Sequence, residues 1–203
     1  EQQFGVNHLG HFALAQALMP LLKKTAALPE SDVRVVALSS TGHKLSDIRW
    51  DDPNWESGDY DKWQAYGQAK TADALFAVGM NKRLGEHGGR AFAVHPGGIV
   101  TPLQRHLGNE EMVAMGWMNE DGELSEQAAK MFKTPTQGAS TTLWAATSPA
   151  LKDRGGEYCE DCDIAELADE ENPSRFNTVQ AYAVDEDSAE RLWAMSEELV
   201  AGV

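Results

Sequence analysis

The sequence is poor in cysteine, in long apolar runs and in basic side chains. It has two cysteines, Cys159 and Cys162, among 203 residues. Two cysteines cannot build a disulfide framework, so the composition favours a reducing compartment. No run of about 18 apolar residues occurs, and the first residues lack the basic and apolar parts of a signal peptide. These absences predict a cytoplasmic protein without a membrane span.

The shortage of basic side chains restricts the partners. Seventeen lysines and arginines stand against 32 acids, which gives a net charge of −15. Such a charge repels phosphates and argues against nucleic acid and anionic membranes as partners. With 42% hydrophobic residues and no repeat or linker, residues 1–203 are expected to form a single globular domain.

Apolar periodicity predicts helices that alternate with short β-branched strands. The helices are expected at 1–24, 63–86, 135–147 and 185–200, and the strands at 33–38, 90–95 and 157–159. This alternation indicates an α/β fold with a parallel sheet covered by helices. Ser40 and the Pro96–Gly97 turn would then lie at the carboxyl ends of strands, where the active sites of such sheets gather.

Tyr66 and Lys70 lie four residues apart, on one face of the second predicted helix. A lysine cation beside a tyrosine favours the phenolate and lowers the tyrosine pKa, as a proton donor near neutral pH requires. The pair alone is weak, because chance often produces this spacing on an exposed helix. Its setting is more specific, since a strand ending in Ser39–Ser40 precedes it and one ending in Pro96–Gly97 follows it.

The chain resembles the short-chain dehydrogenase/reductase family in four segments, FGVNHLGHF, VVALSS, YGQAK and HPGGIVT, which occur in the family's order. The resemblance covers residues 1 to 165 and is strongest to the branch of retinol dehydrogenases and protochlorophyllide reductases. It implies a Rossmann-type doubly wound parallel sheet and hydride transfer between NAD(P) and a small, apolar carbonyl or alcohol substrate. It does not distinguish NADH from NADPH.

The resemblance assigns a role to each matching residue. Tyr66 matches the proton donor and acceptor, and Lys70 the residue that lowers the tyrosine pKa and holds the nicotinamide ribose. Ser40 matches the residue that hydrogen-bonds the substrate oxygen, and Asn7 the asparagine that holds a water in the proton relay. The implied contacts to the cofactor are Asn7, Tyr66, Lys70, Pro96, Gly97, Ile99 and Thr101.

Asp73 departs from the pattern of this branch, which usually has asparagine there. It shares a helix face with Tyr66 and Lys70. Its carboxylate could therefore hold Lys70 charged or partly divert it from Tyr66.

The Gly-rich turn with which the family binds pyrophosphate is absent from the sequence. That turn follows the first strand and presents backbone amides and a helix N-terminus to the phosphates. The helical pattern also begins at Glu1 with no capping residue before it. We therefore expect an N-terminally truncated domain, the C-terminal portion of the fold without its first strands. An oxidoreductase and a non-catalytic binding or assembly subunit both remain compatible with it.

Residues 103–132 are predicted to form the substrate loop. Adaptable side chains suit a lid over an apolar substrate, although core packing would use them equally well: Met112, Met115, Trp117 and Met118.

No metal site is expected, because zinc needs about four ligands and the sequence has a single cysteine pair. A partly buried structural role is preferred for His8 and His11. Quaternary structure is left open, a homo-oligomer included.

Overall fold

The structure, a computed structural model, describes residues 1–169 and 176–202. Its main sheet has the order β1-β2-β3-β4. Three strands are parallel, namely β1 (Arg34–Leu38), β2 (Arg90–His95) and β3 (Tyr158–Glu160), while β4 (Asp163–Ile164) is antiparallel to β3. The predicted α/β fold with a parallel sheet is confirmed, and each predicted strand lies within one residue of an observed one.

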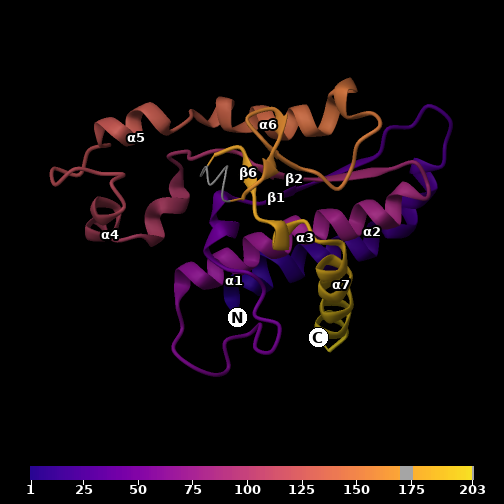
Figure 1. The fold of residues 1–203 in the computed structure, drawn as a ribbon, viewed down its shortest axis with the longest axis horizontal. Helices are drawn as coiled ribbons and strands as arrows, with labels where there is room; N and C mark the ends of the chain where they lie inside the picture. The colour runs from indigo at the N-terminus through magenta and orange to yellow at the C-terminus, as the bar shows by residue number, and fades with distance from the viewer. Residues whose placement is uncertain (170–175, 203) are drawn as a thin grey trace.

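Helices cover both faces of the sheet (Figure 1). On one face lie α2 (Gly10–Ala26), α3 (Lys62–Gly85) and α7 (Glu186–Ala201), and on the other lies α6 (Pro135–Thr147). Side chains of β2 alternate between these layers, as the pleat of a strand requires. Ala91 packs with α2, α3 and α7, whereas Phe92 and Val94 pack with Ala145 of α6.

The first helical segment is continuous but not regular. A short helix α1 (Gln2–Phe4) leads through a π-helical turn η1 (Gly5–Leu9) into α2. Glu1 is the N-cap, and its carboxylate accepts hydrogen bonds from the backbone N–H groups of Gln3 and Phe4. The expectation of an uncapped start is therefore wrong, because the first residue itself satisfies these donors.

The other helix ends follow common capping chemistry. Asp61 caps α3 by accepting from the N–H groups of Trp63 and Gln64. Thr134 and Gln137 form a capping box at the start of α6, with Pro135 in the first turn. These caps explain why both helices begin within one residue of their predicted positions.

The strand β1 is less buried than its apolar sequence predicts. Among the described residues it pairs only with β2, and Leu38 is 51% exposed. The outer face of α2 is also apolar, with Leu14, Leu18 and Leu21 exposed. None of the helices in the described ranges has the length and apolar content needed to span a bilayer.

Shorter elements complete the described chain. They comprise η2 (Thr41–Leu45), η3 (Pro102–His106), α4 (Asn109–Ala114), α5 (Glu126–Met131), η4 (Pro149–Leu151), η5 (Ala181–Ala183) and a two-stranded sheet of β5 (Glu166–Leu167) and β6 (Thr178–Val179). The loop between η2 and α3 is anchored by aromatics, since Arg49 lies 4.0 Å from the ring centroid of Trp55 and Arg191 lies 4.3 Å from that of Trp50.

Candidate active site

Tyr66 and Lys70 share one face of α3, and the Lys70 Nζ atom lies 5.9 Å from the centroid of the Tyr66 ring. Lys70 Nζ donates to the carbonyl of Leu38 at the end of β1 (2.8 Å) and to Asp73 Oδ2 (2.9 Å). An ammonium group has three N–H donors, so one donor is left for solvent or a ligand. The lysine side chain is 14% exposed, which keeps it within reach of a bound molecule.

The serine pair joins the end of β1 to both α3 and β2. The Ser39 N–H donates to the Val94 carbonyl (2.8 Å), and the Ser39 hydroxyl donates to the Lys70 carbonyl (2.7 Å). Ser40 Oγ accepts from the Gly42 N–H (3.0 Å) as the cap of η2. The Ser40 hydroxyl hydrogen is thereby left to donate elsewhere.

Gly42 lies close to both the Tyr66 ring and the Ser40 hydroxyl oxygen. A Cβ atom added at Gly42 would lie 2.5 Å from Tyr66 Cε1 and 3.4 Å from Ser40 Oγ. The absence of a side chain at this position therefore allows the tyrosine ring and the serine hydroxyl to share one small space. Sequence reasoning did not identify Gly42, because its role depends on a contact between η2 and α3.

Asn7 lies in the π-helical turn η1, where the Gly10 N–H donates to the Gly5 carbonyl five residues back. Such turns interrupt an α-helix locally and are frequent at functional sites. The Asn7 carbonyl accepts a hydrogen bond from His11 Nδ1 (2.8 Å). Because η1 packs against α3, Asn7 belongs to a segment adjacent to the one that carries Tyr66 and Lys70. The role predicted for its side chain in a water relay stays a prediction.

The turn that begins at Pro96 follows β2 directly, next to the serine pair at the end of β1. Gly97 has a φ of 93°, in the left-handed region that glycine adopts without strain. Gln104 closes the next part of the turn, since its side chain donates to the Ile99 carbonyl (2.8 Å) and accepts from the Thr101 N–H (2.8 Å). The sequence did not point to Gln104.

A strap from the end of α5 covers the same turn. The Lys133 N–H donates to the Gly98 carbonyl (2.7 Å), and Lys133 forms a parallel bridge with Ile99. A Cβ atom at Gly98 would lie 3.0 Å from the Phe132 ring. The strap and Gln104 therefore hold the predicted nicotinamide-contacting turn from two sides.

The buried residue His43, itself part of η2, is hydrogen-bonded to Ser40 and Gln180. Its Nδ1 atom donates to the Ser40 carbonyl (2.7 Å) and its Nε2 atom accepts from the Gln180 N–H (3.2 Å). Burial lowers the pKa of His43 to about 4, so the ring is neutral at pH 7. A histidine three residues after the serine was the only sequence signal for this contact.

Asp73 is the one buried carboxylate beside Lys70 and Tyr66 in the described part of α3. Its side chain is 6% exposed, and burial raises the pKa of its carboxyl to about 6 against the opposing effects of Lys70 and His11. Asp73 is therefore mostly ionised at pH 7 and paired with Lys70, as the shared helix face predicted.

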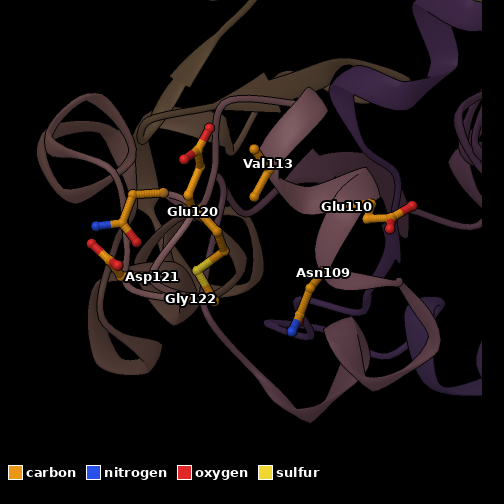
Figure 2. A pocket seen from close by; sticks show the side chains of 8 residues that line it. Asn109, Glu110, Val113, Glu120, Asp121 and Gly122 are labelled. Atoms are coloured by element: carbon orange, nitrogen blue, oxygen red, sulfur yellow. The ribbon is translucent and has the colours of Figure 1, made fainter.

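Residues 109–122 enclose a hollow of about 410 Å³. Figure 2 shows Asn109 and Glu110 on one side of it and Glu120 and Asp121 on the other. Of the Met and Trp side chains predicted to cover a substrate, Met118 lines this hollow. Met112 is buried, and Trp117 packs edge-on against Phe132. The hollow is thus more acidic than an apolar substrate loop would be, and the loop's role stays a prediction.

The helix α4 is fastened to α3 one turn before Tyr66. Glu111 accepts from Lys62 Nζ (2.6 Å) and from Trp63 Nε1 (3.0 Å). The Trp63 ring in turn lies perpendicular to the Tyr66 ring, at a centroid distance of 6.3 Å. Residues 109–122 are thereby coupled to the wall of the candidate site.

The other sequence features have structural roles. Of the two histidines predicted to be partly buried, His8 is fully buried, with its Nε2 atom 2.7 Å from Ser196 Oγ, whereas His11 is exposed and the prediction is wrong for it. Cys159 is buried in the core between β2 and α6, while Cys162 is exposed. Within the described ranges, no group of three or more His, Cys, Asp or Glu side chains is arranged to hold a metal ion.

No protein-family profile matches the chain. It is 39% identical over 193 residues to a Streptomyces lividans protein named "Probable oxidoreductase", an alignment that covers 95% of this chain and 62% of that protein. It is 37% identical over 196 residues to the short-chain dehydrogenase/reductase prx1 of Penicillium rubens, covering 97% of this chain and 55% of the relative. For human retinol dehydrogenase 14 the identity is 35% over 205 residues, covering 98% and 52%. The chain thus spans between 52% and 62% of the length of these relatives.

Solved structures resemble the fold. A crystal structure of an uncharacterised protein from Mycobacterium paratuberculosis superposes with a TM-score of 0.64 at 28% identity, covering 99% of this chain and 59% of that one. A 7α-hydroxysteroid dehydrogenase complexed with NADH and 7-oxo glycochenodeoxycholic acid superposes with a TM-score of 0.52 at 18% identity, covering 77% and 51%. At that identity the second likeness concerns the fold alone.

Proposed function

The chain belongs by homology to the short-chain dehydrogenase/reductase family, and on that premise we propose that it carries the catalytic residues of an NAD(P)-dependent oxidoreductase. The reaction would transfer a hydride between the nicotinamide and the carbon of a small carbonyl or alcohol substrate. The observation that carries this proposal is the convergence of Tyr66, Lys70 and Ser40 at the end of β1.

The residues at this edge of the sheet fit the nicotinamide half of NAD(P). Lys70 keeps one N–H donor on a partly exposed side chain, as contact with a ribose hydroxyl requires. The Pro96–Thr101 turn begins beside Ser39–Ser40, and the Lys133 side chain packs against Gly97, where a Cβ atom would lie 2.7 Å from it. When bound, the cofactor would supply or accept the hydride.

The protein side chains would manage the proton and the substrate oxygen. Ser40 Oγ accepts the Gly42 N–H through a lone pair. Its hydroxyl hydrogen therefore stays available to donate to that oxygen. Tyr66 would give or take the proton at its phenolic oxygen, and Lys70 Nζ lies 5.9 Å from the centroid of its ring. Ser40 and Lys70 each keep a hydrogen-bond donor for these tasks.

The alternative, a non-catalytic assembly subunit, draws support from the exposed apolar face of α2 and the unpaired edge of β1 in the described chain. Measurement of enzymatic turnover distinguishes the two functions, because a non-catalytic subunit does not use the Tyr66 hydroxyl.

Tyr66→Phe is the direct test of the proposed function. Removal of the phenolic hydroxyl should lower the rate of NAD(P)H-linked carbonyl reduction by about 10²- to 10⁴-fold, the usual contribution of a positioned proton donor. Cofactor affinity should change little, since Lys70 and the turn remain. The matched control is Tyr60→Phe, an exposed tyrosine that contacts Gln3 and Glu1. Equal turnover in the two variants, measured by NAD(P)H absorbance, would refute the assignment of Tyr66.

A further inference from the structure

The two glycines of the Pro96–Thr101 turn are covered by the strap, residues 132–133. The three atoms nearest to a Cβ atom placed at Gly97 all belong to the Lys133 side chain, at 2.7–3.0 Å. Those nearest to a Cβ atom at Gly98 belong to the Phe132 ring, at 3.0–3.8 Å. Consecutive glycines allow many backbone conformations, so the shape of this turn depends on the strap that covers it.

The Lys133 side chain is held at both of its ends. Its backbone N–H donates to the Gly98 carbonyl (2.7 Å), and its Nζ atom donates to the Asp161 carboxylate. The aliphatic stem between these two points lies against Gly97. A lysine side chain without a partner at its tip would gain conformational entropy by leaving such a place. The ion pair with Asp161 is therefore expected to keep the stem over the turn.

Asp161 is itself presented by a tight turn between β3 and β4. Asp161 and Cys162 have φ values of 52° and 59°, in the left-handed region that non-glycine residues seldom adopt. The Cys162 N–H donates to Thr141 Oγ1 in α6 (3.2 Å) and helps to hold this shape. Because the strap leads directly into α6 at Pro135, both partners of the ion pair are tied to the same helix.

The ion pair between Lys133 and Asp161 lies near the surface. The two side chains are 25% and 50% exposed. Exposed pairs contribute little to the stability of the whole fold, and salt screens them. The effect of this pair is therefore expected to be local, on the placement of the strap rather than on folding.

We propose that Asp161 is a positioning residue, which holds the strap closed over Gly97 and Gly98 through Lys133 and so fixes the Pro96–Thr101 turn for the nicotinamide end of the cofactor. The inference rests on the proposed function, because it takes this turn as the nicotinamide contact. It adds that a side chain of the β3–β4 turn, outside the candidate catalytic residues, adjusts the affinity for the cofactor.

Two substitutions break the ion pair from opposite sides. Asp161→Asn removes the negative charge without straining the turn, since asparagine tolerates positive φ. Lys133→Met removes the positive charge and keeps an apolar stem over Gly97. In each variant the KM for NADH or NADPH should rise roughly two- to fivefold, the range that an exposed ion pair contributes, with a smaller change in kcat.

The double variant and a control show whether the pair is responsible. Asp161→Asn combined with Lys133→Met should raise KM no further than either substitution alone, because both remove the same interaction. Asp163→Asn is the matched control, since it removes an exposed carboxylate from β4, two residues after Asp161. It should leave KM unchanged.

Amide hydrogen exchange tests the strap without any cofactor. Exchange of the Lys133 N–H, which is bonded to Gly98, should be roughly two- to fivefold faster in both charge variants than in the natural protein. It should be unchanged in Asp163→Asn. Sodium chloride at about 1 M should accelerate the same amide in the natural protein but not in Asp161→Asn, because salt screens an exposed pair.

The outcomes separate the role of Asp161 from the proposed function. Unchanged exchange in both charge variants would overturn the proposal, and so would faster exchange with an unchanged KM. Loss of folding in one variant leaves the other to decide, because each alone breaks the pair. A natural protein that binds neither NADH nor NADPH would refute the proposed function, while exchange would still decide whether Asp161 holds the strap.

Discussion

At the scale of single residues, the geometry of the candidate site depends on Gly42, which has no side chain. Tyr66 and Ser40 approach each other over Gly42, where a Cβ atom would lie 2.5 Å from the tyrosine ring. The ring is partly buried and lies edge-on to Trp63, so a side chain at position 42 would have to displace it. The backbone at Gly42 thus restricts how the candidate residues Tyr66 and Ser40 are placed.

Gly42→Ala should lower turnover more than it lowers the free energy of unfolding. The added methyl group must displace the Tyr66 ring, and overpacking of this kind costs about 1–3 kcal/mol of unfolding free energy. Because the ring moves away from Ser40, turnover should fall by at least about tenfold. Gly85→Ala is the control, since nothing lies within 4 Å of its Cβ position at the end of α3. That control should leave the free energy of unfolding in urea unchanged or raise it. Wild-type turnover in Gly42→Ala would show that the close approach has no catalytic role.

The residues of the candidate site were predictable from sequence to different degrees. Tyr66, Lys70 and Ser40 stand in local motifs whose spacing is visible in the sequence, and the structure brings them to one edge of the sheet. Gly42 and His43 act through contacts with α3 and with Gln180. Such contacts depend on the tertiary fold, so no local pattern reveals them.

At the scale of elements, the Glu111 side chain attaches α4 to the start of α3. Glu111 binds both Lys62 and Trp63 at the start of α3, while its neighbour Glu110 lines the hollow of Figure 2. The position of the hollow relative to α3 is therefore expected to depend on this attachment.

Glu111→Ala should loosen α4 without unfolding the protein. Loss of this ion pair and of the hydrogen bond from Trp63 should make local opening of α4 more frequent, and amide exchange follows local opening. Hydrogen exchange should therefore accelerate in residues 109–118 and stay unchanged in the middle of α3. Glu110→Ala removes the neighbouring carboxylate, which lines the hollow, and it serves as the control. Equal exchange in the two variants would contradict the attachment.

The element boundaries show where sequence patterns fail. Helices with capping residues, such as α6 with Thr134 and Gln137, were placed correctly. The β3–β4 hairpin was missed, because its turn residues Asp161 and Cys162 both adopt positive φ without the glycine that usually marks such a turn. The π-helical turn η1 was missed as well, since its side-chain periodicity differs little from that of an α-helix over five residues.

At the scale of the whole molecule, buried histidines should make the fold sensitive to acid. Burial lowers the pKa of His8 to about 3 and those of His43 and His95 to about 4. A histidine with a lowered pKa in the folded state binds a proton only after unfolding, so stability is lost as the pH falls below about 6.5. Asp73 acts in the opposite direction, because a raised carboxyl pKa of about 6 favours the folded state as the pH falls. The stability lost through the three histidines as the pH falls is expected to exceed the stability gained through the Asp73 carboxyl.

The free energy of unfolding should therefore fall by several kcal/mol between pH 7 and pH 4.5. Urea titrations at pH 7, 6, 5 and 4.5 measure this dependence. His8→Gln, whose amide can still reach Ser196, should flatten the curve, and His87→Gln, on the loop after α3, should leave it unchanged. Stability that stays constant or increases toward pH 4.5 would show that the histidines are not held neutral.

The central claim is that this chain performs hydride transfer with Tyr66 as the proton donor. Its most direct test incubates the natural protein with NADH or NADPH deuterated at nicotinamide C4 and a panel of small aldehydes and ketones, and measures deuterium in the alcohol products by mass spectrometry. The account predicts deuterium on the former carbonyl carbon with the wild-type protein, and at least about a hundredfold less with Tyr66→Phe. Equal labelling by the two proteins, or none by a wild-type protein that binds the cofactor, would contradict it.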